Sequence, residues 1–138
     1  MRRLTCVGLL CLVAAAFASA CGGESQPTDT IAEDVATVRA IVEAYWTALN
    51  DYDADRALPM LEPDYRAAEE ELIRHDVELM ERFSVKLDVS EETPPTVNAD
   101  GDYETYLTLK TPIDTRRLLM VFRLVGDQWW IVFSDEVE

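Results

Sequence analysis

The chain has little positive charge. Its 138 residues include 12 Lys and Arg against 27 Asp and Glu, so the formal net charge is −15 at pH 7. Two of the basic residues, Arg2 and Arg3, lie in an initial stretch (residues 1–20) without any acid, so the formal charge of residues 21–138 becomes −17. Nucleic-acid binding requires clustered Lys and Arg against phosphates, and electrostatic adhesion to anionic lipid requires the same. The charge balance therefore excludes both classes of function.

Cysteine, histidine and glycine are also scarce. Two of the three cysteines, Cys6 and Cys11, lie in an apolar N-terminal run, which leaves Cys21 alone in the rest of the chain. A single cysteine permits no intramolecular disulfide and no zinc site of the Cys/His type, so we expect the fold to depend on packing. No G-x-S-x-G, Walker or dinucleotide-binding glycine pattern is present. We therefore expect no cofactor.

The N-terminus has the pattern of an export signal. Met1-Arg2-Arg3 is basic, and the apolar run 4–17 is shorter than the roughly 20 residues that span a bilayer. The following Ala18-Ser19-Ala20-Cys21-Gly22 resembles the lipobox of bacterial lipoproteins, which implies cleavage before Cys21 and attachment of diacylglycerol to its thiol. The alternative is an ordinary signal peptide whose small residues precede a cysteine by chance.

The resemblance to lipoproteins divides the chain into three parts. Residues 1–20 are the expected signal peptide, 21–29 the lipidated Cys21 with a flexible tether, and 30–138 one domain. The protein is then exported and held by its lipid, in the outer membrane if the host has one and otherwise on the outer face of the plasma membrane. Two or more acyl chains make such an anchor stable.

Helical periodicity fills the first half of the expected domain. Thr30 and Glu33 match a capping box, and apolar residues at intervals of three and four through Leu49 predict one long helix. A short helix is predicted over 54–61, followed by a third from about Tyr65 to Phe83. The apolar side of the third helix is predicted to carry Tyr65, Ala68, Leu72, Leu79 and Phe83.

Beyond the third helix the apolar period changes to two, which predicts strands over 85–89, 103–110, 116–125 and 128–133. Pro94-Pro95 confines its region to a sheet edge or a loop, and Gly126-Asp127 predicts a two-residue hairpin turn. Pairing of Val125 with Gln128 then predicts two faces. One carries Leu118, Met120, Phe122, Leu124, Trp129, Ile131 and Phe133, and the other carries Leu119, Val121, Arg123, Trp130 and Val132.

Helices followed by antiparallel strands predict an α+β fold, with the N-terminal helices packed on one face of the sheet. Segments 43–50, 51–65 and 126–131 together resemble the nuclear transport factor 2-like (cystatin-like) superfamily, which includes SnoaL-like and ketosteroid-isomerase-like domains. The resemblance is closest to its uncharacterised lipoprotein branch and covers nearly all of residues 30–138. It implies a curved sheet wrapped around the helices into a cone whose open end can hold a ligand.

One group of metal-ligating residue types lies on the third predicted helix. Glu71, His75 and Glu78 are one turn apart and could present three ligands. A metal site also needs supporting ligands and ordered outer contacts, so we interpret these residues as a solvated polar stripe.

A second group lies between the first two predicted helices. Asp51, Asp53, Asp55 and Glu62 match positions 1, 3, 5 and 12 of an EF-hand calcium loop. Arg56 stands where the sharp turn of that loop needs glycine, and the same acids suit a helix connection with Asp caps. A calcium-binding module is therefore an alternative, and we expect no metal.

Isomerase chemistry in the resembled superfamily needs a carboxylate base in an apolar pocket, with oxyanion donors beside it. Tyr45 and Tyr65 are candidates to line such a pocket, but no acid lies on the predicted inner faces of the helices or of the last two strands. A SnoaL-like enzyme stays an alternative, and we assign no catalytic residue.

The second face of the last hairpin is apolar enough to suggest a contact surface. Arg123 and Trp130 fall opposite one another on it, which suits a cation–π pair or an interface anchor, unless other segments cover them. With Tyr106 and the two pocket tyrosines, the candidate binding residues are Tyr45, Tyr65, Tyr106, Arg123 and Trp130.

These observations predict a lipid-anchored protein of the cell envelope with a non-catalytic binding or accessory domain. The expected partners are the membrane, through Cys21, and either a small ligand in the cone or a protein on the last hairpin. That protein is a second copy of the chain or another envelope protein.

Overall fold

The computed structural model describes residues 27–137, with side chains from residue 29 onward. The elements follow one another as α1 (Pro27–Asn50), α2 (Ala54–Ala57), a 3₁₀ turn (Leu58–Met60), α3 (Pro63–Phe83), β1 (Asp88–Val97), β2 (Tyr103–Lys110), β3 (Thr115–Val125) and β4 (Gln128–Val137). The expected signal peptide, Cys21 and residues 22–26 of the tether lie outside the described residues. No helix within 27–137 is long and apolar enough to cross a membrane.

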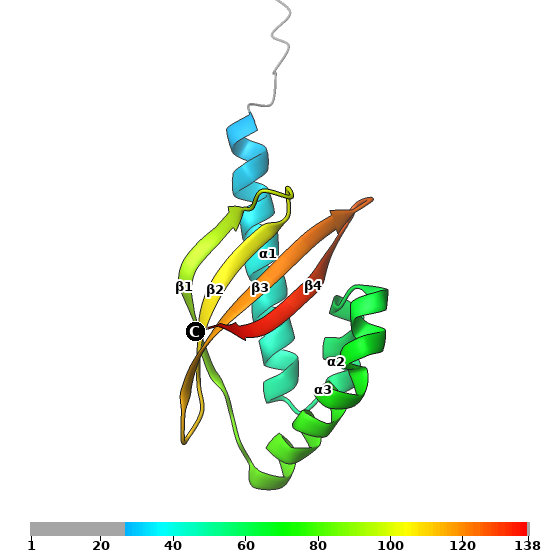
Figure 1. Cartoon of the computed structure of the whole chain (residues 1–138), viewed down its shortest axis with the longest axis vertical. Helices are drawn as coiled ribbons and strands as arrows, with labels where there is room; N and C mark the ends of the chain where they lie inside the picture. The colour runs from blue at the N-terminus through cyan, green and yellow to red at the C-terminus, as the bar shows by residue number, and fades with distance from the viewer. Residues whose placement is uncertain (1–26, 138) are drawn as a thin grey trace, which may run out of the picture.

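The four strands form one antiparallel sheet in the order β1-β2-β3-β4, so each strand pairs with its neighbours in the sequence. Figure 1 shows α1 running along one face of this curved sheet, with α2 and α3 set to the side of β4. The predicted α+β class is confirmed, with the N-terminal helices packed on an open antiparallel sheet.

The long first helix begins earlier than predicted. α1 starts at Pro27, so Thr30 lies within its first turn and is not the residue that caps it. Proline is favoured at this position because its missing N–H would be unpaired there anyway. The predicted capping box is therefore wrong, and residues 27–29 belong to the helix rather than to the tether.

The predicted short helix is confirmed as α2 with its 3₁₀ turn, and α3 ends at Phe83 as predicted. The predicted apolar side of α3 is confirmed only in part: Tyr65 packs against the core and Leu79 is half-buried, whereas Ala68 is exposed and Leu72 and Phe83 are 56% and 68% exposed. Val77 is the buried residue of Pro63–Phe83, with Ile73 packed against the core and Met80 half-buried. Spacings of three and four also connect 73, 77 and 80, so periodicity alone could not choose between the two sides.

The first strand is displaced from its predicted position. β1 starts at Asp88 rather than at residue 85 and continues through Pro94-Pro95. It tolerates these prolines because it is an edge strand, one of the two settings (edge or loop) that the sequence allowed, and because its pairing with β2 is shifted on both sides of Thr93. β2 matches its predicted range.

The β3–β4 hairpin has the predicted Val125–Gln128 pairing, and Gly126 provides the positive φ of 64° that the turn requires. Further along, Phe122 pairs with Ile131 but Val121 pairs with Phe133, so Val132 is an extra residue in β4. This β-bulge reverses the alternation of side chains. Phe133 therefore moves to the outer face, where it is 40% exposed, and its predicted inward position is wrong.

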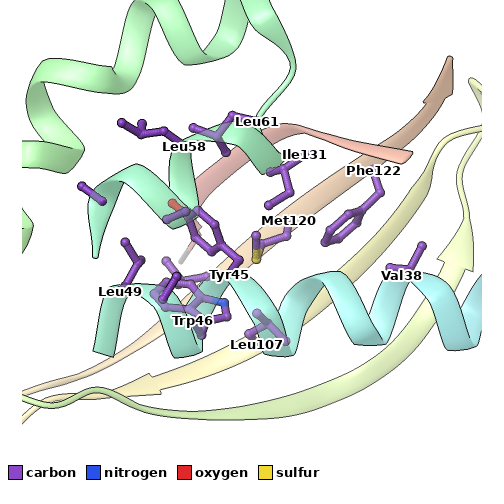
Figure 2. Close-up of a cluster of buried hydrophobic side chains, with 14 of the residues drawn as sticks. Val38, Tyr45, Trp46, Leu49, Leu58, Leu61, Leu107, Met120, Phe122 and Ile131 are labelled. Atoms are coloured by element: carbon purple, nitrogen blue, oxygen red, sulfur yellow. The ribbon is translucent and has the colours of Figure 1, made fainter. Parts of the chain in front are cut away.

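The core lies between α1 and the inner face of the sheet. Figure 2 shows Met120, Phe122 and Ile131 projecting from the sheet toward α1. The Tyr45 ring reaches from α1 toward the segment that carries Leu58 and Leu61 (Figure 2). That segment is joined to β4 because the backbone N–H of Glu62 donates to the carbonyl of Ile131 at 2.9 Å.

Candidate functional site

A cavity of about 440 Å³ lies between α1, α3 and the inner face of the sheet. Its walls are mainly apolar and come from α1, α3 and the sheet. The apolar lining includes Tyr45, Trp46 and Leu49 from α1, Ile73, Val77 and Met80 from α3, and Leu109 and Leu118 from the sheet.

The first turn of α3 is held to the sheet by one side chain. The Tyr65 hydroxyl donates to the Ser134 carbonyl at 3.1 Å and accepts from the Ser134 N–H at 2.9 Å. Beyond this point Val77 is the buried residue of α3, and Figure 1 shows the helix standing beside the sheet rather than lying on it. The volume between them is therefore left incompletely filled. Tyr65 does not line the cavity but holds its wall in place, a role the sequence did not indicate.

Tyr45 of α1 brings a phenol to the cavity lining. Burial raises the pKa of the Tyr45 phenol, and the nearby Tyr65, Glu69 and Asp76 raise it further. The phenol therefore stays protonated at neutral pH and can donate a hydrogen bond. No residue within 27–137 makes a hydrogen bond to the Tyr45 hydroxyl.

Two charged residues of opposite sign also line the cavity. Asp76 is exposed and forms no ion pair or hydrogen bond with any residue that the structure describes. Arg116 is also exposed, but it binds Asp114 at 3.0 Å and Glu136 at 3.2 Å. Both carboxylates raise the Arg116 pKa. The charge of Arg116 is thus already balanced, whereas that of Asp76 is not.

The presence of Asp76 corrects the prediction that no acid lies on an inner face. The sequence did not indicate it because the predicted apolar side of α3 ran through Ala68 and Leu72 and omitted Ile73 and Val77. With the correct face, Asp76 lies beside Val77 in the sequence and at the edge of the apolar wall. Its exposure means that it is solvated, unlike the desolvated carboxylate base that isomerase chemistry needs.

Trp46 lines a second cavity as well as this one. Its side chain also lines a space of about 470 Å³ between α1 and β1, together with Arg39, Asn50 and Leu87. The residue is 9% exposed, and its indole N–H has no hydrogen-bond partner among the described residues. A buried donor without a partner loses the hydrogen bond it would make to water. A ligand with a hydrogen-bond acceptor within reach of this nitrogen would therefore gain binding free energy.

The other candidate binding residues lie on the outer face of the sheet. Arg123 pairs with Trp130 across the β3–β4 ladder, as predicted. Its guanidinium, however, is engaged by the buried Asp102 carboxylate at 2.6 Å and 3.0 Å. Tyr106 has a different cation over its ring, Arg117 at 4.2 Å. The predicted Arg123–Trp130 cation–π pair is therefore replaced by an ion pair and by a neighbouring cation–π contact.

The polar stripe of α3 stays in solvent. Glu71, His75 and Glu78 are all exposed, and Glu78 pairs with Arg82 at 2.9 Å. Within residues 27–137, no group of three or more His, Cys, Asp or Glu is arranged to hold a metal ion.

The acids of the calcium-loop pattern have separate local roles. Asp51 binds Arg56 at 2.6 Å and Asp55 binds Arg74 at 2.8 Å. Asp53 caps α2, and Glu62 caps α3 by accepting from the two N–H groups that follow Pro63. These four acids form the helix connection with Asp caps, which was the interpretation of this segment without a metal.

Comparison of the chain with models of known protein families and with curated proteins gives no match. A function for this chain is therefore inferred from the cavity, from its polar groups and from the sequence pattern. Of the five candidate binding residues, the structure places only Tyr45 in the cavity.

Proposed function

We propose that this protein is a lipid-anchored binding module of the bacterial cell envelope. In this proposal Cys21 carries the lipid, and a nuclear transport factor 2-like domain holds a small, largely apolar ligand between α1, α3 and the sheet. The observation that carries the proposal is the cavity of about 440 Å³ with mainly apolar walls and few polar groups. Ligand sites commonly have volumes of about 300–1,000 Å³ and this kind of lining.

The site favours binding over catalysis. A general base would need to be held close to substrate with a pKa near the working pH. The only acid that lines the cavity within the described residues is Asp76, which is exposed. The Tyr45 hydroxyl is protonated and suited to donate a hydrogen bond that orients a ligand.

The position of the cavity along α1 is consistent with an N-terminal anchor. A helix rises about 1.5 Å per residue, so Tyr45 lies about 27 Å from Pro27 along α1. The lipid on Cys21 would be attached beyond the opposite end of this helix. The cavity is then held away from the attached lipid, where α1 acts as a spacer.

Binding can be tested with an uncharged amphiphile. The described core is complete within residues 27–137, so the domain comprising residues 22–138 is used without lipid. We expect saturable binding of n-octyl glucoside below its micelle concentration, measured by isothermal titration calorimetry. Met80→Trp fills the cavity and should weaken binding about tenfold or more, which corresponds to about 1.4 kcal/mol.

The matched control is Leu72→Trp, which adds the same ring to the exposed side of the same helix. It should bind octyl glucoside like the unaltered domain. Absence of saturable binding to the unaltered domain, or equal weakening by both tryptophans, would show that the cavity is not a ligand site.

A second candidate function is docking of a protein on the outer face of the sheet. Phe133 is exposed there, and Val121, its pairing partner, and Trp130 are only half-buried. If this face is an interface, Trp130→Ala and Val121→Ser will change the oligomeric state measured by analytical ultracentrifugation or abolish partner recovery. A monomeric domain with unchanged partner recovery in both variants would exclude it.

A further inference from the structure

The two charged residues that line the cavity differ in whether they are paired, and this difference favours one class of ligand. Asp76 has no ion-pair partner among the described residues, whereas Arg116 is bound by both Asp114 and Glu136. A negative headgroup would have to compete with two carboxylates for Arg116. A positive headgroup would find the Asp76 carboxylate free.

The surroundings reinforce this preference. Glu69 lies close enough to Tyr45 and Tyr65 to act on both phenols, and it makes no ion pair within residues 27–137. The Tyr45 hydroxyl oxygen lacks a hydrogen-bond donor from the described residues and can accept one from an ammonium group. The large negative charge of the chain repels anions in general and attracts cations.

Resting on the binding function proposed above, we infer that the ligand of this cavity is a cationic amphiphile. Its hydrocarbon part lies among Ile73, Val77 and Leu118, and its ammonium group lies at the opening beside Asp76. The apolar walls provide most of the binding free energy through burial of the chain. The unpaired carboxylate selects the sign of the headgroup.

Three probes with the same octyl chain separate the contribution of the apolar chain from that of the headgroup charge. They are n-octylammonium, n-octyl glucoside and n-nonanoate, whose carboxylate follows an octyl chain, each titrated below its micelle concentration into the domain comprising residues 22–138. We expect n-octylammonium to bind most tightly and n-nonanoate least. Asp76→Asn should weaken n-octylammonium about threefold, which is typical of an exposed ion pair, and leave n-octyl glucoside unchanged.

Glu71→Gln is the matched control, because it removes the same charge from an exposed position of the same helix that does not line the cavity. It should keep the preference for n-octylammonium. The preference should also weaken when salt is added, because exposed charges are screened.

The outcomes distinguish this inference from the function on which it rests. If the three probes bind equally, if n-nonanoate binds most tightly, or if Asp76→Asn and Glu71→Gln behave alike, the assignment of a cationic ligand is wrong although the cavity still binds. If none of the probes binds, the proposed binding function fails and the inference fails with it.

Discussion

Replacing Tyr65 by phenylalanine tests how the wall of the cavity is held. The change removes one hydroxyl that makes two hydrogen bonds to the backbone of Ser134, at 3.1 Å and 2.9 Å. Each such bond contributes about 0.5–1.5 kcal/mol net. Because Ser134 is half-buried, water replaces part of the loss. We therefore expect Tyr65→Phe to lower the free energy of unfolding by about 1–2 kcal/mol.

The measurement is urea unfolding of the domain followed by far-ultraviolet circular dichroism, with an unchanged slope and a lower midpoint. Thermal unfolding should shift by about 4–8 °C for each kcal/mol in a domain of this size. Tyr106→Phe is the matched control, because the Tyr106 hydroxyl makes no hydrogen bond to the described residues. Its effect should stay within about 0.5 kcal/mol.

Two results would refute the reasoning. If Tyr65→Phe is as stable as the unaltered domain, the hydroxyl does not hold α3 against β4. If Tyr106→Phe is destabilised to the same extent, the loss is a general effect of removing a tyrosine hydroxyl and not of the contact with Ser134.

Three further predictions follow from the same contacts and from the sequence. Ile131→Ala should lower the free energy of unfolding by about 2–5 kcal/mol, because Ile131 is fully buried. Phe133→Ala, on the outer face, should lower it by less than about 1 kcal/mol. If urea unfolding gave the reverse order, the β-bulge in β4 would be contradicted. Because the folded-state pKa of Tyr45 is raised above its ordinary value of 10.0, its stabilising contribution is complete below pH 10.0 and is lost as the pH rises beyond it. Tyr45→Phe should therefore flatten the alkaline fall in the urea midpoint, and an unchanged fall would exclude Tyr45 as its source. Cys21→Ser should abolish labelling by radioactive palmitate and release the protein from the membrane fraction; continued labelling would show that Cys21 is not the lipidated residue.

Features set by neighbouring residues could be predicted well. The Gly126 turn and the Val125–Gln128 pairing depend on two residues and on the alternation beside them, and both are confirmed. The range of β2 and the end of α3 are likewise set by local sequence, and both match the prediction. Pro94-Pro95 limited its region to an edge or a loop, because proline lacks the N–H that an interior strand would use, and β1 is an edge strand.

The bulge in β4 shows where local pattern fails. Apolar alternation continues through Phe133, yet the strand gains an extra residue at Val132 and turns Ser134 inward. Ser134 is held by Tyr65, which lies 69 positions earlier in the sequence. A contact over that separation leaves no periodic signal, so the side that Phe133 occupies could not be predicted.

The residues of the candidate site could not be predicted from the sequence for the same reason. Apolar residues occur on two sides of α3, and only the position of the sheet decides which side faces inward. That choice brings Asp76 to the cavity, leaves Leu72 in solvent, and places Tyr65 outside the lining.

The sequence by itself determined the order of helices and strands, the hairpin turn, the edge strand and the negative charge, because each depends on residue type or on short-range periodicity. It also provides the expectation of a lipidated Cys21. Only the tertiary structure decided that α3 stands off the sheet, that Arg116 is balanced by Asp114 and Glu136, and that Asp76 is left unpaired. Cavities and free charges arise from distances between segments far apart in the chain, and those distances are set by packing.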